Sequence, residues 1–199
     1  MNATGSVDAA VAAIRRGELI VMPTDTVYGI AADPFSPHAV DRLLTAKGRG
    51  REKPSGVLIG SWTDLARITP PLSPAARALA EAFWPGALSL ILPQVPELGW
   101  DLGETGGTVM VRMPAHPLAL EVLHRCGPLA VSSANLHGEP AAATATEAAG
   151  PLGDRVAVYL EAGPVAGVAS TILDLDLNVI RSGGVTTQQI DDLMRDLRA

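Results

Sequence analysis

The 199-residue sequence predicts an α/β fold, in which helices pack against a sizeable mixed β-sheet. Segments with helical spacing of apolar residues alternate with short apolar runs along the chain. A tight turn follows residue 131 and other connections have hairpin length, which argues against a purely parallel sheet. Hydrophobic residues make up 47% of the chain and charged residues 18%, so we expect one packed domain over residues 1–199.

The first helix and the first strand are predicted from the residues at their ends. Ser6 is a typical N-cap, apolar residues recur behind it at helical spacing, and Gly17 suits the position just past a helix. The apolar run 18–22 then predicts a buried strand. Pro23 ends that strand, because proline has no N–H to donate to the ladder.

The next two helices show similar start signals. Ser36 is the expected N-cap of a helix with Pro37 in its first turn, and Gly48 stops it. The run 56–60 is short and apolar, as in a strand. Residues 61–64 then have the spacing of a capping box, which predicts another helix.

Helices and strands keep alternating in the second half of the chain. A helix begins at Ser73 and ends at the Trp-Pro-Gly sequence 84–86, and residues 116–126 have helical spacing. Thr144 and Thr186 begin two further helices. The expected strands of this half are the apolar runs 87–92, 108–112, 129–131, 156–160 and 171–175.

The charge distribution limits the kind of partner that the surface can bind. A net charge of −6 argues against a protein that coats nucleic acid through a uniformly basic surface. The strongest local cluster is Lys47, Arg49, Arg51 and Lys53, interleaved with glycines that let a backbone approach a phosphate. From residue types alone, this cluster is either an anion site or a solvated basic loop.

The sequence predicts a cytoplasmic protein without a membrane segment. No apolar run approaches the ~18 residues that span a bilayer, and charges interrupt the N-terminal stretch where a signal peptide would need an apolar core. The single cysteine, Cys126, excludes an internal disulfide, and we expect a buried, inert thiol there. The four scattered histidines show no metal-ligand spacing, so no protein-held metal is expected.

The common catalytic and nucleotide motifs are absent. The chain contains no GxxxxGK[ST], GxGxxG, GxSxG or HExxH sequence. Polar clusters at 24–26 and 132–135 each follow a predicted strand, and they could bind a small polar ligand or form ordinary turns. Arg112 and Arg181 could hold an anionic ligand or pair with a structural carboxylate. Residue chemistry alone therefore indicates an α/β domain with an anion-binding crevice.

A family resemblance carries the interpretation further. Seven short motifs occur in a characteristic order: PT[ED]TxYG at 23–29, KxR at 47–49, WPG at 84–86, RxP at 112–114, SxN at 133–135, ST at 170–171 and IRxG at 180–183. Taken together, they resemble the YrdC-like family of threonylcarbamoyl-AMP synthases, nearly from end to end. The resemblance implies a twisted open sheet with a basic concave crevice.

The resemblance also implies a reaction. ATP, L-threonine and bicarbonate would give threonylcarbamoyl-AMP and pyrophosphate, for the threonylcarbamoyl-adenosine modification of tRNA. Mg²⁺ would enter with the phosphates of ATP, because the sequence offers no evident carboxylate cage. The chain matches the short, single-domain type, which needs separate proteins to transfer the carbamoyl group to tRNA.

Site residues follow from the motifs that match. Lys47 and Arg49 would be catalytic, and removing Lys47 would cost turnover while folding barely changes. The resemblance implies that threonine and its carbamate lie among Thr26, Arg112, Ser132, Ser133 and Ser170. It implies that the nucleotide contacts Arg49, Thr108, Asn135, Arg181 and the backbone of Ala134 and Ala142.

Two departures and two alternative functions accompany this interpretation. The chain has Leu136-His137 and Ser182 where the family often has serine and proline. A basic crevice could instead serve a module that binds RNA weakly without turnover, although the acidic net charge and the few aromatics argue against that as the main role. A relative that carbamoylates or adenylates another substrate is the second alternative.

Overall fold

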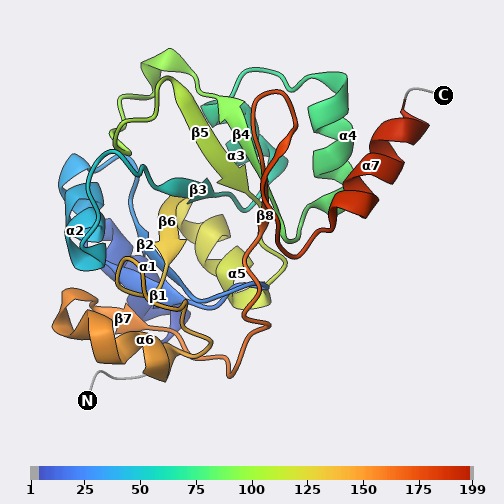
Figure 1. The fold of residues 1–199 in the computed structure, drawn as a ribbon. Coiled ribbons are helices and arrows are strands. Elements are labelled where there is room, and N and C mark those ends of the chain that lie inside the picture. The colour runs from blue at the N-terminus through green and yellow to red at the C-terminus, as the bar shows by residue number, and fades with distance from the viewer. Residues whose placement is uncertain (1–4, 198–199) are drawn as a thin grey trace.

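The computed structural model describes residues 5–197, which form seven α-helices and nine β-strands (Figure 1). The helices are α1 (Val7–Arg15), α2 (Pro37–Lys47), α3 (Trp62–Ile68), α4 (Pro74–Phe83), α5 (Pro117–Cys126), α6 (Ala145–Leu152) and α7 (Thr187–Asp196). The strands are β1 (Ile20–Met22), β2 (Gly29–Ala32), β3 (Gly56–Leu58), β4 (Leu88–Pro93), β5 (Thr108–Arg112), β6 (Leu129–Ser133), β7 (Val158–Tyr159), β8 (Thr171–Leu173) and β9 (Val179–Arg181).

All nine strands of the described chain belong to one open sheet in the order β7-β1-β2-β6-β3-β5-β4-β8-β9. The pairs β1–β7, β3–β5 and β4–β8 are parallel, and the other neighbouring pairs are antiparallel. The predicted α/β fold with a twisted, open, mixed sheet and flanking helices is therefore confirmed.

The helix starts lie where the sequence predicts them. Six hydroxyl N-caps each accept a hydrogen bond from the backbone N–H three residues further on: Ser6, Ser36, Ser61, Ser73, Thr144 and Thr186. Each bond satisfies an N–H that has no partner within the helix. Gly48 follows α2 with φ of 60°, a left-handed conformation that glycine adopts without strain. Because α2 ends there, Lys47 is fixed in its last turn.

The strands β1, β3, β7 and β8 are shorter than the predicted runs 18–22, 56–60, 156–160 and 171–175, and β2, β6 and β9 differ further from the prediction. Strand β2 was not predicted, because its Gly-Ile-Ala-Ala sequence has little β-propensity of its own. It forms by pairing with β1 and β6. Strand β6 continues through Ser132 and Ser133, so these serines lie inside the sheet rather than in a turn after it. Strand β9 forms the edge of the sheet and carries Arg181 as its last residue.

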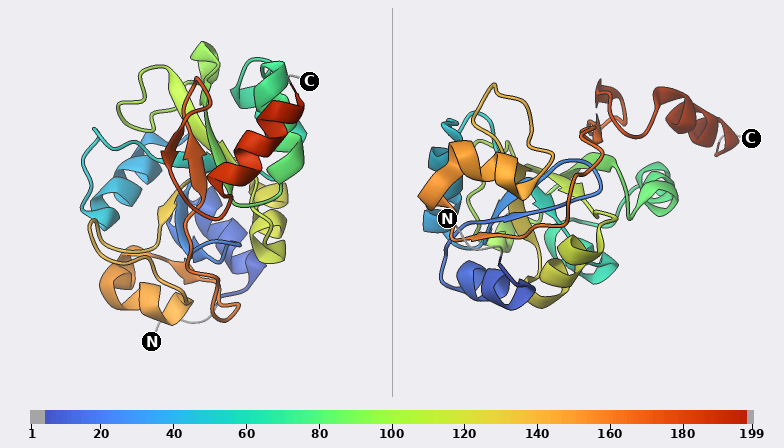
Figure 2. Two further views of the ribbon diagram at one scale, coloured as in Figure 1. Left: turned by 45° about the vertical axis from the view of Figure 1, so that its right-hand side comes forward. Right: turned by 90° about the horizontal axis from the view of Figure 1, so that it is seen from below.

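Hydrophobic side chains cover both faces of the sheet. In β1, Ile20 and Met22 pack in the cluster that includes residues of α1 and α5, whereas Val21 points into the cluster that includes residues of α2 and α6. Figure 2 (right) shows α1 and α5 on one side of the sheet and α6 on the other. Cys126, at the end of α5, is partly rather than fully buried. In residues 5–197, no helix is long and apolar enough to cross a membrane.

Candidate functional site

A cavity of 270 Å³ opens at the middle of the sheet. Its size lies just below the ~300–1,000 Å³ typical of small-molecule sites, so a larger ligand would extend out of it. The polar lining comes from strand ends and adjoining loops: Thr24, Thr26, Arg49, Ser89, Arg112, Ser132, Ser133, Asn135, Glu139, Ser170 and Arg181. Three cations and one carboxylate thus line the described cavity, and none of its lining residues is Cys, His or Lys.

Strand order explains why these distant segments meet. Strand β6 lies between β2 and β3, with Ser133 opposite Gly29 and Val131 opposite Gly56. Strand β3 runs parallel to β5, which places Leu58 beside Arg112. The polar carboxyl ends of β5 and β6 and the neighbouring apolar residues of β2 and β3 therefore line one space, and ligands of such sheets commonly bind at strand ends.

The Thr24–Thr26 turn is locked by its own hydroxyl groups. The Thr24 hydroxyl donates to the Val27 carbonyl at 2.6 Å and accepts from the Thr26 N–H at 3.2 Å. The two threonine hydroxyls lie 2.9 Å apart. Because the Thr24 proton is used by Val27, the Thr26 hydroxyl donates to Thr24 or to a ligand.

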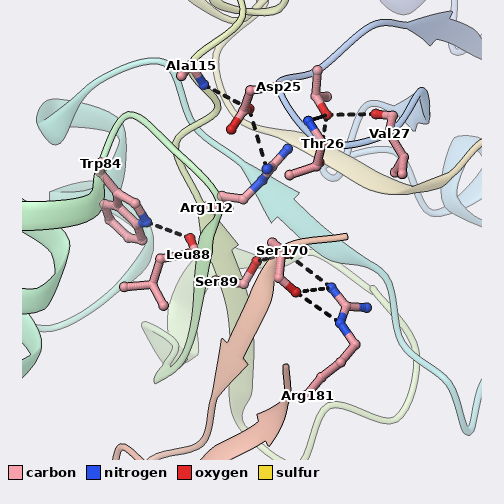
Figure 3. A network of polar contacts seen from close by, with 11 residues as sticks. Asp25, Thr26, Val27, Trp84, Leu88, Ser89, Arg112, Ala115, Ser170 and Arg181 are labelled. Atoms are coloured by element: carbon pink, nitrogen blue, oxygen red, sulfur yellow. Dashed lines mark hydrogen bonds and ion pairs between the residues drawn. The ribbon is translucent and has the colours of Figure 1, made fainter. Parts of the chain in front are cut away.

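Arg112 is a buried cation with incomplete bonding. Its Nη1 lies 3.4 Å from the Asp25 carboxylate, whose Oδ1 accepts from the Ala115 N–H at 2.9 Å (Figure 3). Nη1 is fully buried and has no hydrogen-bond partner among the described residues. Burial lowers the pKa of Arg112, and the charge of Asp25 opposes that shift. A buried N–H without a partner in a polar cavity indicates a place for a ligand acceptor.

A second polar group connects β4, β8 and β9. Arg181 donates from Nε and Nη2 to the Ser170 carbonyl at 3.0 and 2.8 Å, and from Nη2 to its hydroxyl at 3.0 Å (Figure 3). The Ser170 hydroxyl also lies 2.8 Å from the Ser89 hydroxyl. A side chain at Gly183 would collide with main-chain atoms of Ala169 and Ser170, which explains the glycine of the IRxG motif.

Lys47 lies behind the cavity wall rather than in it. Its Nζ donates to the Ser133 carbonyl at 2.5 Å, the Asn135 carbonyl at 2.5 Å and the Asn135 Oδ1 at 2.8 Å. The Ser133 hydroxyl lies further away, at 3.4 Å, so the three close acceptors match the three protons of an ammonium group. Burial, with a smaller contribution from the charge of Arg49, lowers the pKa of Lys47 to about 8. Lys47 therefore fixes the loop that carries Asn135.

Arg49 reaches the opposite end of the same wall. Its Nη1 donates to the Ser132 hydroxyl at 3.1 Å, whereas its buried Nε has no partner among residues 5–197. His137, one of the departures from the family pattern, donates its N–H to the Lys47 carbonyl at 2.8 Å. Its ring Nε2 lies 2.9 Å from the Lys53 Nζ. The basic loop is thereby tied to the 133–139 loop on the solvent side.

The comparisons with known proteins agree with this architecture. Residues 12–183 match the model of the Sua5–YciO–YrdC family, whose description reads "telomere recombination". The chain belongs to this family. A relative from Mycobacterium tuberculosis H37Rv, provisionally named a threonylcarbamoyl-AMP synthase, is 54% identical over 93% of this chain and 87% of the relative. The Bacillus subtilis threonylcarbamoyl-AMP synthase is 41% identical over 92% of this chain and 54% of its own length.

Solved structures of the Sua5–YciO–YrdC family share the fold. Pyrococcus abyssi Sua5 complexed with L-threonine aligns with a TM-score of 0.85 at 34% identity, over 94% of this chain and 57% of that one. Escherichia coli YciO aligns with a TM-score of 0.83 over 92% of both chains. Its 23% identity supports the fold alone.

Eight of the twelve predicted site residues of this family member line the cavity: Thr26, Arg49, Arg112, Ser132, Ser133, Asn135, Ser170 and Arg181. Four do not. Lys47 lies behind the wall. Thr108 is at the far end of β5 from Arg112, where its hydroxyl donates to the Thr105 carbonyl at 2.8 Å. Ala134 and Ala142 are buried, and their main chains bond to Tyr28.

Three polar lining residues are missing from the predicted site residues, namely Thr24, Ser89 and Glu139. Thr24 belongs to the polar cluster 24–26, which the sequence had already indicated as a candidate for ligand binding. Ser89 was the one polar residue in the predicted strand 87–92, and a buried hydroxyl in such a run is a usable signal. Glu139 carries no local signal, because only the folding of the 133–142 loop brings it to the cavity.

Proposed function

We propose that this protein is an L-threonylcarbamoyladenylate synthase. The observation that carries the proposal is the set of three guanidinium groups, those of Arg49, Arg112 and Arg181, in a cavity lined by hydroxyls. Arg49 Nε and Arg112 Nη1 each lack a hydrogen-bond partner among residues 5–197. Such donors suit a ligand rich in anionic oxygens. Family membership supports the proposal, as do relatives that carry this activity in their names and a family structure with bound L-threonine.

The proposed reaction needs no nucleophile from the protein. The amine of threonine and bicarbonate give a carbamate and water. A carbamate oxygen then attacks the α-phosphorus of ATP, and the bond to pyrophosphate breaks as the new bond forms. Catalysis of this kind consists of positioning the reactants and stabilising developing charge.

The amino-acid end of the cavity is assigned to Arg112, Thr26 and Ser170. Arg112 would pair with the threonine carboxylate, because its Nη1 is a buried donor in need of an acceptor. The hydroxyls of Thr26 and Ser170 would orient the substrate, together with Ser132 and Ser133 on the facing strand.

The nucleotide would lie toward Arg49, Asn135 and Arg181. Arg49 has a free Nε, and Arg181 presents its guanidinium from the edge strand. The backbone of Ala134 and Ala142 and the hydroxyl of Thr108 would contact its outer part. The charge of Lys47 would act on the reacting carbamate and α-phosphate from behind Asn135.

Magnesium would arrive as part of the ATP substrate. Within residues 5–197 no group of three or more His, Cys, Asp or Glu side chains is placed to hold a metal ion. The donor set of the cavity is rich in arginine and hydroxyls and poor in carboxylates, which suits phosphate oxygens rather than a bare cation. The adenylate product would pass to separate proteins that modify tRNA.

The test is to incubate the protein with ATP, Mg²⁺, bicarbonate and one amino acid at a time, and to measure pyrophosphate and the adenylate. We expect threonine to exceed serine by about 10-fold, because one methyl group contributes about 1–3 kcal/mol, and to exceed valine by more. Equal turnover of threonine and valine would contradict the threonine assignment. Salt-dependent RNA binding without turnover would favour the RNA-binding alternative.

A further inference from the structure

Residues 161–170 form a strap whose last two residues line the cavity. The strap joins β7, at one edge of the sheet, to β8, with six strands lying between them. Strand spacing of about 4.8 Å places these strands roughly 34 Å apart in a flat sheet, close to the ~40 Å that a connection of this length can reach. Figures 1 and 2 show this orange-to-red segment running from β7 toward β8.

The end of the strap belongs to the cavity itself. Ala169 and Ser170 line it, and the Gly167 N–H donates to the Thr26 carbonyl at 2.8 Å. The Val165 N–H donates to the Ala143 carbonyl at 3.0 Å. The position of the strap therefore determines the distance between Ser170 and Thr26 across the amino-acid end.

Burial holds the strap at few points: Val165 packs against the hydrophobic core, and Ser170 is buried. Ala162, Pro164 and Ala166 are exposed, and so is Val168, at 52%. Gly163 and Gly167 adopt φ of 77° and 73°, left-handed conformations that favour glycine and let the strap turn. A segment with so little buried apolar surface opens locally unless polar bonds hold it.

Main-chain bonds hold the strap at Val165 and Gly167, and a second set of bonds converges on Tyr28 and Glu161. The Tyr28 hydroxyl accepts from the Ala162 N–H at 3.0 Å. It lies 2.9 Å from both the Glu161 Oε1 and the Gly163 carbonyl, one of which takes its single proton. Glu161 accepts from the Gly163 N–H at 2.7 Å and from the N–H of Ala145, the first residue of α6, at 3.2 Å. One buried hydroxyl and one carboxylate thus connect the strap to α6.

Tyr28 also connects the strap to the proposed nucleotide end. Its N–H donates to the Ala142 carbonyl at 3.2 Å, and its own carbonyl accepts from the Ala134 N–H at 2.8 Å. Its side chain is fully buried, which raises the pKa of Tyr28 to about 12 and keeps the hydroxyl protonated. Tyr28 therefore bonds the nucleotide end through its main chain, whereas its hydroxyl bonds, within residues 5–197, only residues 161–163 of the strap.

We infer that Tyr28 and Glu161 are positioning residues that hold the strap against Thr26 and so set the affinity for the amino-acid substrate. This inference rests on the proposed function for its substrate. The two residues do not line the cavity, and they act through Thr26 and Ser170. The amino-acid end depends on the strap through Thr26 and Ser170. At the nucleotide end, Arg181 bonds the strap at Ser170, whereas Arg49 and Asn135 bond to residues outside it.

Tyr28→Phe tests the inference, with Tyr159→Phe as the matched control. Tyr159 is equally a buried tyrosine, its hydroxyl donates to the Gly153 carbonyl at 2.8 Å, and it lies away from the cavity. We expect Tyr28→Phe to raise the KM for threonine on the order of tenfold, with kcat and the KM for ATP changed less than about threefold. Glu161→Gln keeps one acceptor oxygen and should raise the same KM by a smaller factor.

Hydrogen exchange of the Val165 and Gly167 amides measures the local opening of the strap directly, because both amides donate the bonds that hold it. Both variants should speed this exchange on the order of tenfold, whereas Tyr159→Phe should leave it unchanged. Tyr28→Phe and Glu161→Gln with exchange like that of Tyr159→Phe would overturn the inference, as would equal rises in the KM of threonine and ATP. If the native protein shows no threonine-dependent turnover, the proposed function fails, and exchange still decides whether these residues hold the strap.

Discussion

Lys47 and Arg112 are both cations buried beside the cavity, with 2% and 6% of their surface exposed, yet their surroundings differ. Lys47 donates hydrogen bonds to the main-chain carbonyls of Ser133 and Asn135 and to the amide oxygen of Asn135. Arg112 has one carboxylate at 3.4 Å and a buried Nη1 without a hydrogen-bond partner. Burial of a charge costs stability unless its partners offset the desolvation. Lys47 thus contributes to the stability of the fold, while Arg112 is the residue that we propose to bind the ligand.

Arg112→Met should produce the largest loss of activity. It removes a buried donor pair from the proposed carboxylate site, so we expect kcat/KM for threonine to fall on the order of 10³-fold. Its free energy of unfolding should stay within about 1 kcal/mol of the native value or rise, because a poorly paired buried charge is removed. Pyrophosphate release and urea unfolding measure the two quantities. Arg112→Lys keeps the charge without the planar fork, and full activity in either variant would exclude Arg112 from the site.

Lys47→Met, in contrast to Arg112→Met, should lower the stability of the protein markedly and its activity less. The variant leaves three buried acceptors of Ser133 and Asn135 without their donor, which we expect to lower the free energy of unfolding by about 2–3 kcal/mol. The sequence alone had predicted almost unchanged folding. Turnover should fall on the order of 10²-fold. Thermal unfolding and pyrophosphate release would show both effects. Unchanged stability would show that Lys47 does not hold the loop, and unchanged turnover would remove it from catalysis.

The pH dependence of turnover tests whether the positive charge of Lys47 contributes to the rate. With a pKa lowered to about 8, the side chain is charged below pH 8 and loses its proton above it. If the charge supports turnover, activity is present at pH 7 and declines as pH rises through 8. The rate of the native protein divided by that of Lys47→Arg should fall on the order of tenfold between pH 7 and 9.5, because arginine stays charged. The ratio cancels the titration of threonine itself. A constant ratio would mean that the charge of Lys47 does not enter the rate.

Ser89 should give the smallest of these effects, because it is a neutral lining residue whose hydroxyl is already bonded to that of Ser170. Its Oγ lies 2.8 Å from that of Ser170, which also accepts from Arg181. Ser89→Ala should raise the KM for threonine about threefold to fivefold, as expected for one neutral hydrogen bond. Ser89→Thr keeps the hydroxyl and should retain more of the native value. A larger loss in the threonine variant than in the alanine variant would indicate packing rather than hydrogen bonding.

The sequence by itself determined the helices, most of the strands and the α/β class. Caps such as Ser6, Ser36 and Thr186 act within a few residues, so their effect can be read locally. Apolar runs likewise predict buried strands without knowledge of their neighbours. The family motifs supplied twelve site residues, of which eight line the cavity.

Tertiary structure alone decided what depends on pairing between distant segments. Strand β2 exists because β1 and β6 supply its hydrogen bonds, and Ser132 and Ser133 lie within β6 for the same reason. The contrast between Lys47 and Arg112 was likewise invisible in the sequence, where both are cations beside a predicted strand or helix end. A charge becomes a structural bond or a free donor according to which oxygens lie within about 3 Å of it, and folding brings those oxygens from elsewhere in the chain.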